Sequence, residues 1–350
     1  MLFIPHKPLY ITGASYISAE EPDYKEVITD ANSRRRMGRL LKMAVWCGLK
    51  SLDGVPFERV AGIITSTGAG FMKDTISFGS SIFDREETLL NPSPFMQSTF
   101  NTASGYIALI RKIHAYNTTY VQRADGFAAS LVDAAMLLDD AGEGNVALVG
   151  AFDEVTPEVD VIRQRLGLYR VGDGFLPLGE GAAAFLLSAA MPTDVSDSCR
   201  ATESSARLGG GDGSESDSGR DGDEAGSESA SEHGDESGSE SSSEPLYESW
   251  GTSSSSLNGT KDGNAALRFC GLANLSDFPK CAENPIAELF GINAAVNVIS
   301  CADHVESLGA FRSLLPVLLC KLISEQKIPD GYTAIVDDVN ENGVIVLLHK

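Results

Sequence analysis

Residues 91–110 read NPSPFMQSTFNTASGYIALI, and residues 116–126 read YNTTYVQRADG. The first stretch leads into a helix expected over 99–115, because its apolar residues recur at helical spacing. The second contains a strand expected over 117–122, since Thr, Tyr and Val favour extended backbone. Another helix, expected over 127–142, ends at a glycine. Helix, strand and helix follow one another with short connections, as in a sheet that helices cover.

The rest of the chain repeats this alternation of strands and helices. Apolar strands are expected at 8–13, 60–68, 145–154, 182–188, 332–338 and 344–349. Further helices are expected at 33–53 and 305–324, with a short helix and loop at 70–84, and Pro316 should kink the helix at 305–324 or displace one of its hydrogen bonds. Strands that are apolar without strict alternation favour a parallel or mixed sheet with both faces covered. The sequence therefore predicts an α/β fold.

One segment breaks the pattern. Residues 196–263 are nearly all Ser, Gly, Asp and Glu, and residues 196–244 hold fourteen acidic and three basic side chains. That stretch supplies half of the formal net charge of −22. Such a composition buries too little apolar surface to offset the entropy of ordering. We expect a long disordered acidic insertion, a solvated loop rather than a regulatory tail or a divalent-ion sponge, between residues 1–195 and 264–350 of one fold.

Composition also bears on partners, cofactors and location. The negative charge disfavours a nucleic-acid partner. No apolar run of about 18 residues predicts a membrane span, and the start of the chain does not read as a signal peptide. The six cysteines are scattered without a CxxC pair, and Gly68 and Gly70 read as a turn rather than a phosphate loop. We expect no metal, no cofactor and a cytoplasmic location.

Three segments resemble the β-ketoacyl synthases of the thiolase superfamily. They are PSPFMQSTFNTASGYIAL, then NTTYVQRADGFAASLVDAAMLL with NVALVGAFDE, and finally GDGFLPLGEGAAAFLLS at 172–188. The resemblance covers roughly residues 8–190 and is greatest to divergent bacterial members that accompany aryl-polyene and flexirubin-type pigment synthesis. It implies a thiolase-like layered α/β/α/β/α fold, with residues 1–195 as its ketosynthase-like N-terminal region and 264–350 as a short C-terminal part.

The resemblance also implies a position for the nucleophile. In that family a strand ends at a cysteine that begins a buried helix, whose N-terminus stabilises the thiolate. That position falls at Ala124, give or take one residue, between Arg123 and Asp125. Ala124 has no nucleophile, and the Asp125 carboxylate is a poor acyl acceptor that we expect to cap the helix beginning near Phe127. The resemblance thus implies a ketosynthase-like chain that has lost its usual nucleophile.

Other family motifs are incomplete as well. Of the family's two histidines, only His304 in SCADHVESLGAF has a similar setting, and we expect it to be structural or capping rather than a residual catalytic group. Trp250-Gly251-Thr252 matches the other histidine motif only loosely. Residues 340–343 stand where the family has a Gly-rich oxyanion loop. The glycines around Glu180 are expected to allow close backbone packing, with a functional role for Glu180 as the alternative.

Three functions fit these observations. The leading one is a non-catalytic or impaired β-ketoacyl synthase-like subunit, similar to chain-length factors. It would form a dimer, most readily with an active ketosynthase, and meet acyl chains on an acyl carrier protein in fatty-acid or polyketide (aryl polyene) biosynthesis. The second is an acyl-carrier-protein-dependent acyltransferase with relocated chemistry at Ser66, Cys301 or His304. The third is a degenerate scaffold or binding protein.

Limited proteolysis tests the expected insertion. A protease should cut first within 196–263, because disordered backbone enters protease sites most readily. The two fragments should remain associated, since each contributes strands and helices to one fold. Fragments that separate and unfold independently, or a resistant segment, would contradict the assignment.

Overall fold

The computed structural model describes residues 2–18, 20–122, 125–142, 144–191, 266–277, 285–340 and 342–350. The elements, contacts and surfaces of the structure are those of these residues. The acidic segment 196–263 lies outside them, as do the two boundaries expected at 195 and 264.

The part before the acidic segment supplies most of the regular elements. Its strands are β1 (Leu2–Phe3), β2 (Leu9–Ile17), β3 (Val60–Ser66), β4 (Tyr116–Tyr120), β5 (Val146–Asp153), β6 (Arg170–Val171), β7 (Gly174–Phe175) and β8 (Gly181–Ser188). Its helices are α1 (Ala31–Arg36), α2 (Arg39–Ser51), α3 (Met72–Asp84), α4 (Pro92–Gln97), α5 (Thr102–Arg111), α6 (Asp125–Asp140) and α7 (Pro157–Leu166), with 3₁₀ turns η1 (Tyr24–Glu26) and η2 (Phe57–Arg59).

The part after the acidic segment is shorter. Its strands are β9 (Arg268–Asn274), β10 (Val296–Ser300), β11 (Tyr332–Val336) and β12 (Val344–His349). Its helices are α9 (Pro285–Leu289), α10 (Val305–Leu308) and α11 (Leu314–Ser324), with 3₁₀ turns η3 (Leu275–Asp277) and η4 (Ala302–His304). In the described ranges, no helix combines the length and the apolar character that crossing a membrane requires.

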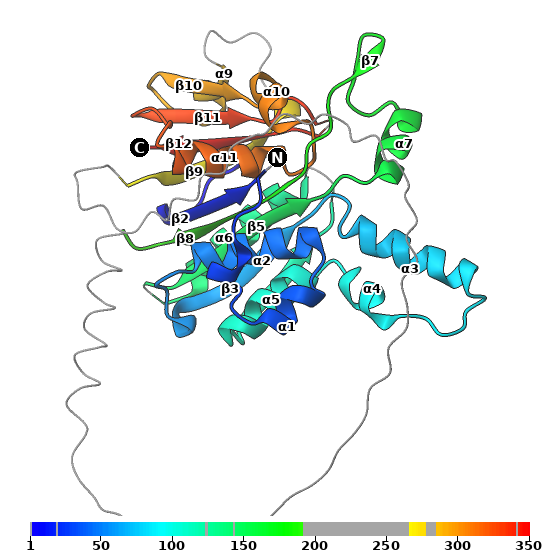
Figure 1. The fold of residues 1–350 in the computed structure, drawn as a ribbon. Helices are drawn as coiled ribbons and strands as arrows, with labels where there is room; N and C mark the ends of the chain where they lie inside the picture. The colour runs from blue at the N-terminus through cyan, green and yellow to red at the C-terminus, as the bar shows by residue number, and fades with distance from the viewer. Residues whose placement is uncertain are drawn as a thin grey trace, which may run out of the picture.

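Ten strands join in one mixed sheet, which Figure 1 shows as a stack of arrows. The order is β10-β11-β12-β9-β2-β8-β5-β3-β4, with β1 beside β9. Strand β3 runs parallel to both β4 and β5, whereas β8 is antiparallel to β5 and β2. Only two residue pairs, Leu9 with Phe269 and Tyr10 with Arg268, join β2 to β9. The sheet thus consists of two half-sheets that meet at a short seam.

Alternating side chains show how the helices cover these half-sheets. Ala183, Phe185 and Leu187 of β8 belong to the core cluster that contains α6 and α11, and the intervening Ala184 and Leu186 to the cluster that contains α2 and α5. Strand β12 alternates in the same way, between the α6–α11 cluster and a cluster that contains α9. The layers are therefore α2 and α5, the first half-sheet, α6 and α11, the second half-sheet, and α9. The predicted α/β/α/β/α fold is confirmed.

The helix predicted over 33–53 is instead two helices, because the backbone is extended at Met37 and Gly38. The Gly38 N–H donates to Gln97 Oε1 at 2.7 Å. A Cβ atom on Gly38 would lie 3.0 Å from Asp74 Oδ2. The break is therefore set by contacts with α3 and α4, which local propensity does not reveal.

The kink predicted at Pro316 is wrong. The helix expected over 305–324 divides into α10 and α11, because Gly309 adopts a left-handed φ of +75° between them. Pro316 then falls in the first turn of α11. A residue there has no helical acceptor for its N–H, so proline costs nothing.

Candidate functional site

The residues expected to carry chemistry lie where three parallel strands end. Strands β3, β4 and β5 end at Ser66, Tyr120 and Asp153, and helix α6 begins just beyond them. Gly126, in the first turn of α6, packs against this edge. A Cβ atom there would lie 3.4 Å from both the Ser66 Cβ and the Tyr120 carbonyl oxygen. The start of α6 therefore sits directly over the carboxyl ends of β3 and β4.

The predicted nucleophile position, Ala124, lies outside the described residues, as does Arg123. Asp125 is described, and it is the first residue of α6 rather than a cap before a helix starting near Phe127. Its N–H donates to the Gln122 carbonyl oxygen at 3.0 Å. The Asp125 carboxylate is thus placed at the positive end of the helix dipole, where a negative charge is stabilised.

Asp153, which the sequence analysis did not single out, organises this edge of the sheet. Its carboxylate accepts hydrogen bonds from Thr67 Oγ1, from the N–H groups of Gly68 and Ala69, and from Ser313 Oγ, at 2.6–3.2 Å. Burial raises the pKa of Asp153, and these donors offset part of that rise. The network ties the end of β5 to the turn after β3 and to the start of α11. The only signal in the sequence was an acid directly after an apolar strand.

The turn predicted at Gly68 and Gly70 is confirmed by this network. Gly70 has a φ of +73°, and its N–H donates to Thr67 Oγ1 at 2.8 Å. The neighbouring Gly68 N–H points to Asp153 rather than to an anion site. The turn serves to hold the ends of β3 and β5 together.

A groove of about 710 Å³ runs from this edge along α6. Its lining comprises Tyr120, Gln122, Asp125, Ala128, Ala129, Val132, Asp133, Met136, Asn274, Ser276, Asn342 and Gly343. The groove brings Asp125 and the loop that stands for the family's oxyanion loop to one place, although they are far apart in sequence. Asn340, in the same loop, is occupied elsewhere: its amide donates to both Asp337 carboxylate oxygens at 2.8 and 3.0 Å.

The described groups that line the groove are suited to binding. Burial, followed by the charge of Asp133, raises the pKa of Tyr120 to about 12, so its phenol stays protonated at neutral pH. The other polar groups in its lining are carboxylates, side-chain amides and the Ser276 hydroxyl. No cysteine, histidine or lysine is among the described residues that line it. Such a surface can hold an extended apolar chain beside α6.

The sequence comparisons agree with the N-terminal half of this architecture. The family model described as "Beta-ketoacyl synthase, N-terminal domain" matches residues 15–169, which include β3, β4, α6 and β5. Residues 15–169 are therefore similar to the N-terminal domain of β-ketoacyl synthases. No curated protein matches its sequence.

Solved structures share the fold of this ketosynthase-like chain at low sequence identity. The ishigamide ketosynthase/chain length factor aligns with a TM-score of 0.58 and 13% identity, covering 98% of this chain and 99% of that one. AntDE:AntF, a type II polyketide ketosynthase with its acyl-carrier protein, gives 0.57 and 14%, with coverages of 98% and 99%. A β-ketoacyl synthase from Burkholderia phymatum STM815 gives 0.56 and 10%, with coverages of 98% and 98%. These likenesses show the fold.

The residues considered for a relocated active site do not form a nucleophile–base pair. Ser66 donates to the Gly150 carbonyl oxygen at 3.4 Å. Burial, followed by the charges of Asp337 and Asp338, raises the pKa of the Cys301 thiol well above its usual value. His304 is half-buried, and its pKa is lowered mainly by burial. In the part of the chain that the structure describes, no side-chain hydrogen bond connects Ser66, Cys301 and His304.

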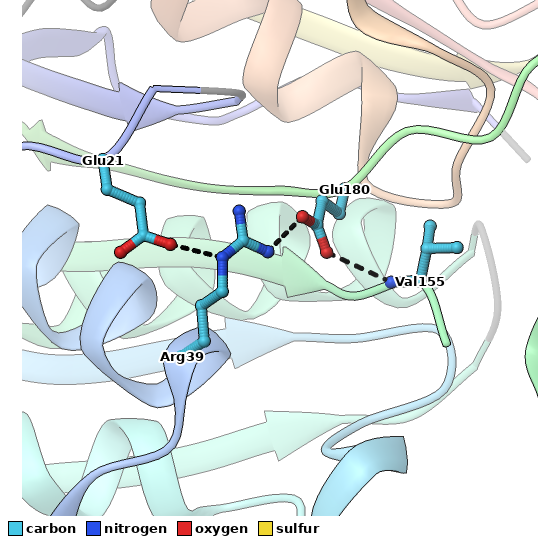
Figure 2. Close-up of polar contacts among 4 residues, drawn as sticks. All are labelled: Glu21, Arg39, Val155 and Glu180. Atoms are coloured by element: carbon cyan, nitrogen blue, oxygen red, sulfur yellow. Dashed lines mark hydrogen bonds and ion pairs between the residues drawn. The ribbon is translucent and has the colours of Figure 1, made fainter. Parts of the chain in front are cut away.

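Glu180 forms an ion pair and a hydrogen bond that connect parts of the fold. Its carboxylate pairs with the Arg39 guanidinium, which also pairs with Glu21, and Figure 2 shows Arg39 between the two acids. The other Glu180 oxygen accepts from the Val155 N–H at 3.4 Å. Arg39 begins α2, so Glu180 links the outer helix layer to the segment after β5. The neighbouring Gly179 lies against Gly309 and the Leu308 carbonyl oxygen, as expected for close backbone packing.

Asp153→Ala should destabilise this ketosynthase-like chain substantially. The substitution leaves several buried donors without an acceptor, and each orphaned group costs about 1–3 kcal/mol. We expect a loss of roughly 3 kcal/mol in the free energy of unfolding, measured by urea denaturation with circular dichroism. Asp173→Ala removes an equal charge from an exposed turn and should change it by less than about 0.5 kcal/mol. Equal effects of the two substitutions would contradict the role given to the Asp153 network.

Proposed function

We propose that this chain is a non-catalytic ketosynthase-like subunit, similar to chain-length factors, in the assembly of fatty-acid or polyketide chains of the aryl-polyene type. The observation that carries the proposal is Arg123-Ala124-Asp125 at the position where the family resemblance implies a cysteine. The groove beside α6 supports it, because no described lining residue supplies a substitute thiol or imidazole. A chain of this kind shapes a shared channel and leaves the bond-forming chemistry to another subunit.

The groove supports a role in holding an acyl chain. The α6 side of its lining is apolar at Ala128, Ala129, Val132 and Met136. An acyl chain laid along this helix would gain roughly 25 cal/mol of binding free energy for each square ångström of apolar surface that it removes from water. Asp125 and Tyr120 line the groove where β4 ends and α6 begins, and the polar thioester end would lie beside them. An acyl carrier protein would therefore present its chain from the β4 end of the molecule.

The free edge of the sheet supports a partnership. Strand β4 pairs only with β3, so one side of its backbone lacks a strand partner among the described residues. An open edge of this kind is an aggregation hazard unless something covers it. In the ketosynthase family the strand before the nucleophile pairs across a two-fold axis. We infer that β4 pairs with the same strand of an active ketosynthase subunit.

The chain alone should not catalyse Claisen condensation. Each missing acid, base or oxyanion group typically costs ~10²–10⁴ in rate. The pure protein would be incubated with acyl and malonyl carrier proteins, and the β-keto product measured by mass spectrometry. An active ketosynthase in parallel serves as the positive control. Product at ordinary enzymatic turnover, or an acyl adduct on any residue of this chain, would refute the proposal and favour the acyltransferase alternative.

Co-expression with an active ketosynthase from the same genome tests the partnership. We expect a 1:1 complex by light scattering, with an interface on the order of 2,000 Å² or more, as obligate dimers bury. Tyr120→Asp places a charge on the half-buried face of β4 and should abolish the complex. Asp173→Ala, in an exposed turn, should leave it intact. Failure to form a complex, or indifference to Tyr120→Asp, would show that β4 does not mediate assembly.

A further inference from the structure

The β4–α6 face, defined here as Tyr116, Tyr120, Val121, Asp133 and Met136, is an unpartnered surface at one end of the sheet. Tyr116, Val121 and Met136 expose 45%, 39% and 61% of their surface. The opposite edge strand, β10, exposes one large apolar residue, Val298. The β4 edge therefore combines unpaired backbone with more exposed apolar side chains than the β10 edge has, as expected of a protein interface.

Asp133 lies at the middle of this face. Tyr116 and Tyr120 point to the same side of β4, with Thr118 between them, because side chains alternate along a strand. Tyr116 Oη donates to Asp133 Oδ2 at 3.0 Å. The charge of Asp133 and a hydrogen bond to it also help to raise the pKa of Tyr120. The Asp133 carboxylate therefore lies beside the side of β4 that carries both tyrosines, bonded to Tyr116 and close enough to Tyr120 to act on its phenol.

The described residues of this face carry no positive charge to balance Asp133. Helix α6 reads DGFAASLVDAAMLLDD, with four aspartates and no lysine or arginine. The described residues that line the neighbouring groove include no base either. The nearest cationic partners of α6, His6 and Lys7, contact Asp139 near the far end of the helix. Among the described residues, which do not include Arg123, Asp133 has two tyrosine neighbours and no counter-ion.

This arrangement opposes pairing between two copies of the chain. Antiparallel pairing of β4 with itself about its centre would set Tyr116 of one copy opposite Tyr120 of the other. The strand sequence YNTTY is nearly symmetrical and would allow that register. The same two-fold axis would bring both Asp133 carboxylates together in the water-excluded middle of the interface. Two like charges juxtaposed there cost several kcal/mol.

We propose that the β4–α6 face binds a different chain of the same fold, which presents an arginine to Asp133, and that Asp133 prevents self-pairing. A guanidinium would meet the carboxylate through charge-assisted hydrogen bonds and stack against the two flanking phenol rings. Lysine offers the charge without the planar fork, so arginine fits this site better. The choice of a ketosynthase-type partner rests on the proposed function, whereas the exclusion of a second copy rests on the geometry of this face.

A charge-exchange experiment on this chain alone tests the proposal without a purified partner. Wild type, Asp133→Asn, Asp133→Arg and an equimolar mixture of wild type with Asp133→Arg would be compared by sedimentation velocity, one component carrying a mass tag. We expect wild type and Asp133→Arg to be monomeric separately and to form a 1:1 complex when mixed. Asp133→Asn should self-associate about 10-fold or more tightly than wild type, because the repulsion is removed.

The controls separate this inference from a folding defect and from the proposed function. Asp139→Asn makes the same charge change at the other end of α6 and should not alter association. Thermal unfolding checks that each variant is folded, and Tyr120→Asp should dissociate the mixed complex. A wild-type dimer as tight as that of Asp133→Asn, or a mixture that stays monomeric, would overturn the inference. Condensation activity would overturn the proposed function instead and leave these measurements unaffected, since they use no substrate.

Discussion

The structure depends on the burial of α6 and α11 between two half-sheets. Leu314, Leu318 and Leu319 of α11 are at most 1% exposed, and their cluster includes strand residues from both ends of the chain. Because only two residue pairs join the half-sheets directly, the apolar middle layer supplies most of their association. This layer also determines where the groove lies, since one side of α6 remains uncovered next to β4. The packing of the middle helix layer therefore determines the position of the candidate site.

Asp153 holds separate elements together through hydrogen bonds, as the middle helix layer does through apolar packing. A carboxylate at the end of a buried strand is costly unless donors surround it. Here the turn after β3 and the residue before α11 provide these donors. Their hydrogen bonds offset the cost of burying the carboxylate and connect β3, β5 and α11. The same edge carries catalytic groups in active members of the family. In this chain that edge is held together by the hydrogen bonds of Asp153, and a fold can be stable whatever chemistry it hosts.

The sequence predicted the elements that bury a regular apolar pattern. Strands β3, β5, β8 and β12 and helix α6 lie within two residues of their expected positions, because each is specified by its own apolar side chains. The failures have tertiary causes. The break at Gly38 comes from Gln97 and Asp74, and the division before α11 from a positive φ at Gly309. Asp153 was missed because its donors come from segments far apart in sequence, and Asp133 because its significance depends on which strand is left at the sheet edge.

Electrostatics connect the acid at the start of α6 to the acids further along this helix. A helix N-terminus carries about half a positive elementary charge, which in a ketosynthase would stabilise a thiolate. In this chain Asp125 supplies a carboxylate at that end, so the favourable field is already used by a group of the protein. Where no thiolate has to be stabilised at the start of the helix, further aspartates along that helix do not raise the free energy of such an anion. Two turns later Asp133 lies over the free strand edge, where a carboxylate distinguishes one partner from another. Asp125 and Asp133 thus belong to one helix and line one groove, so the acid at the start of α6 and the acid beside β4 act on the same surface.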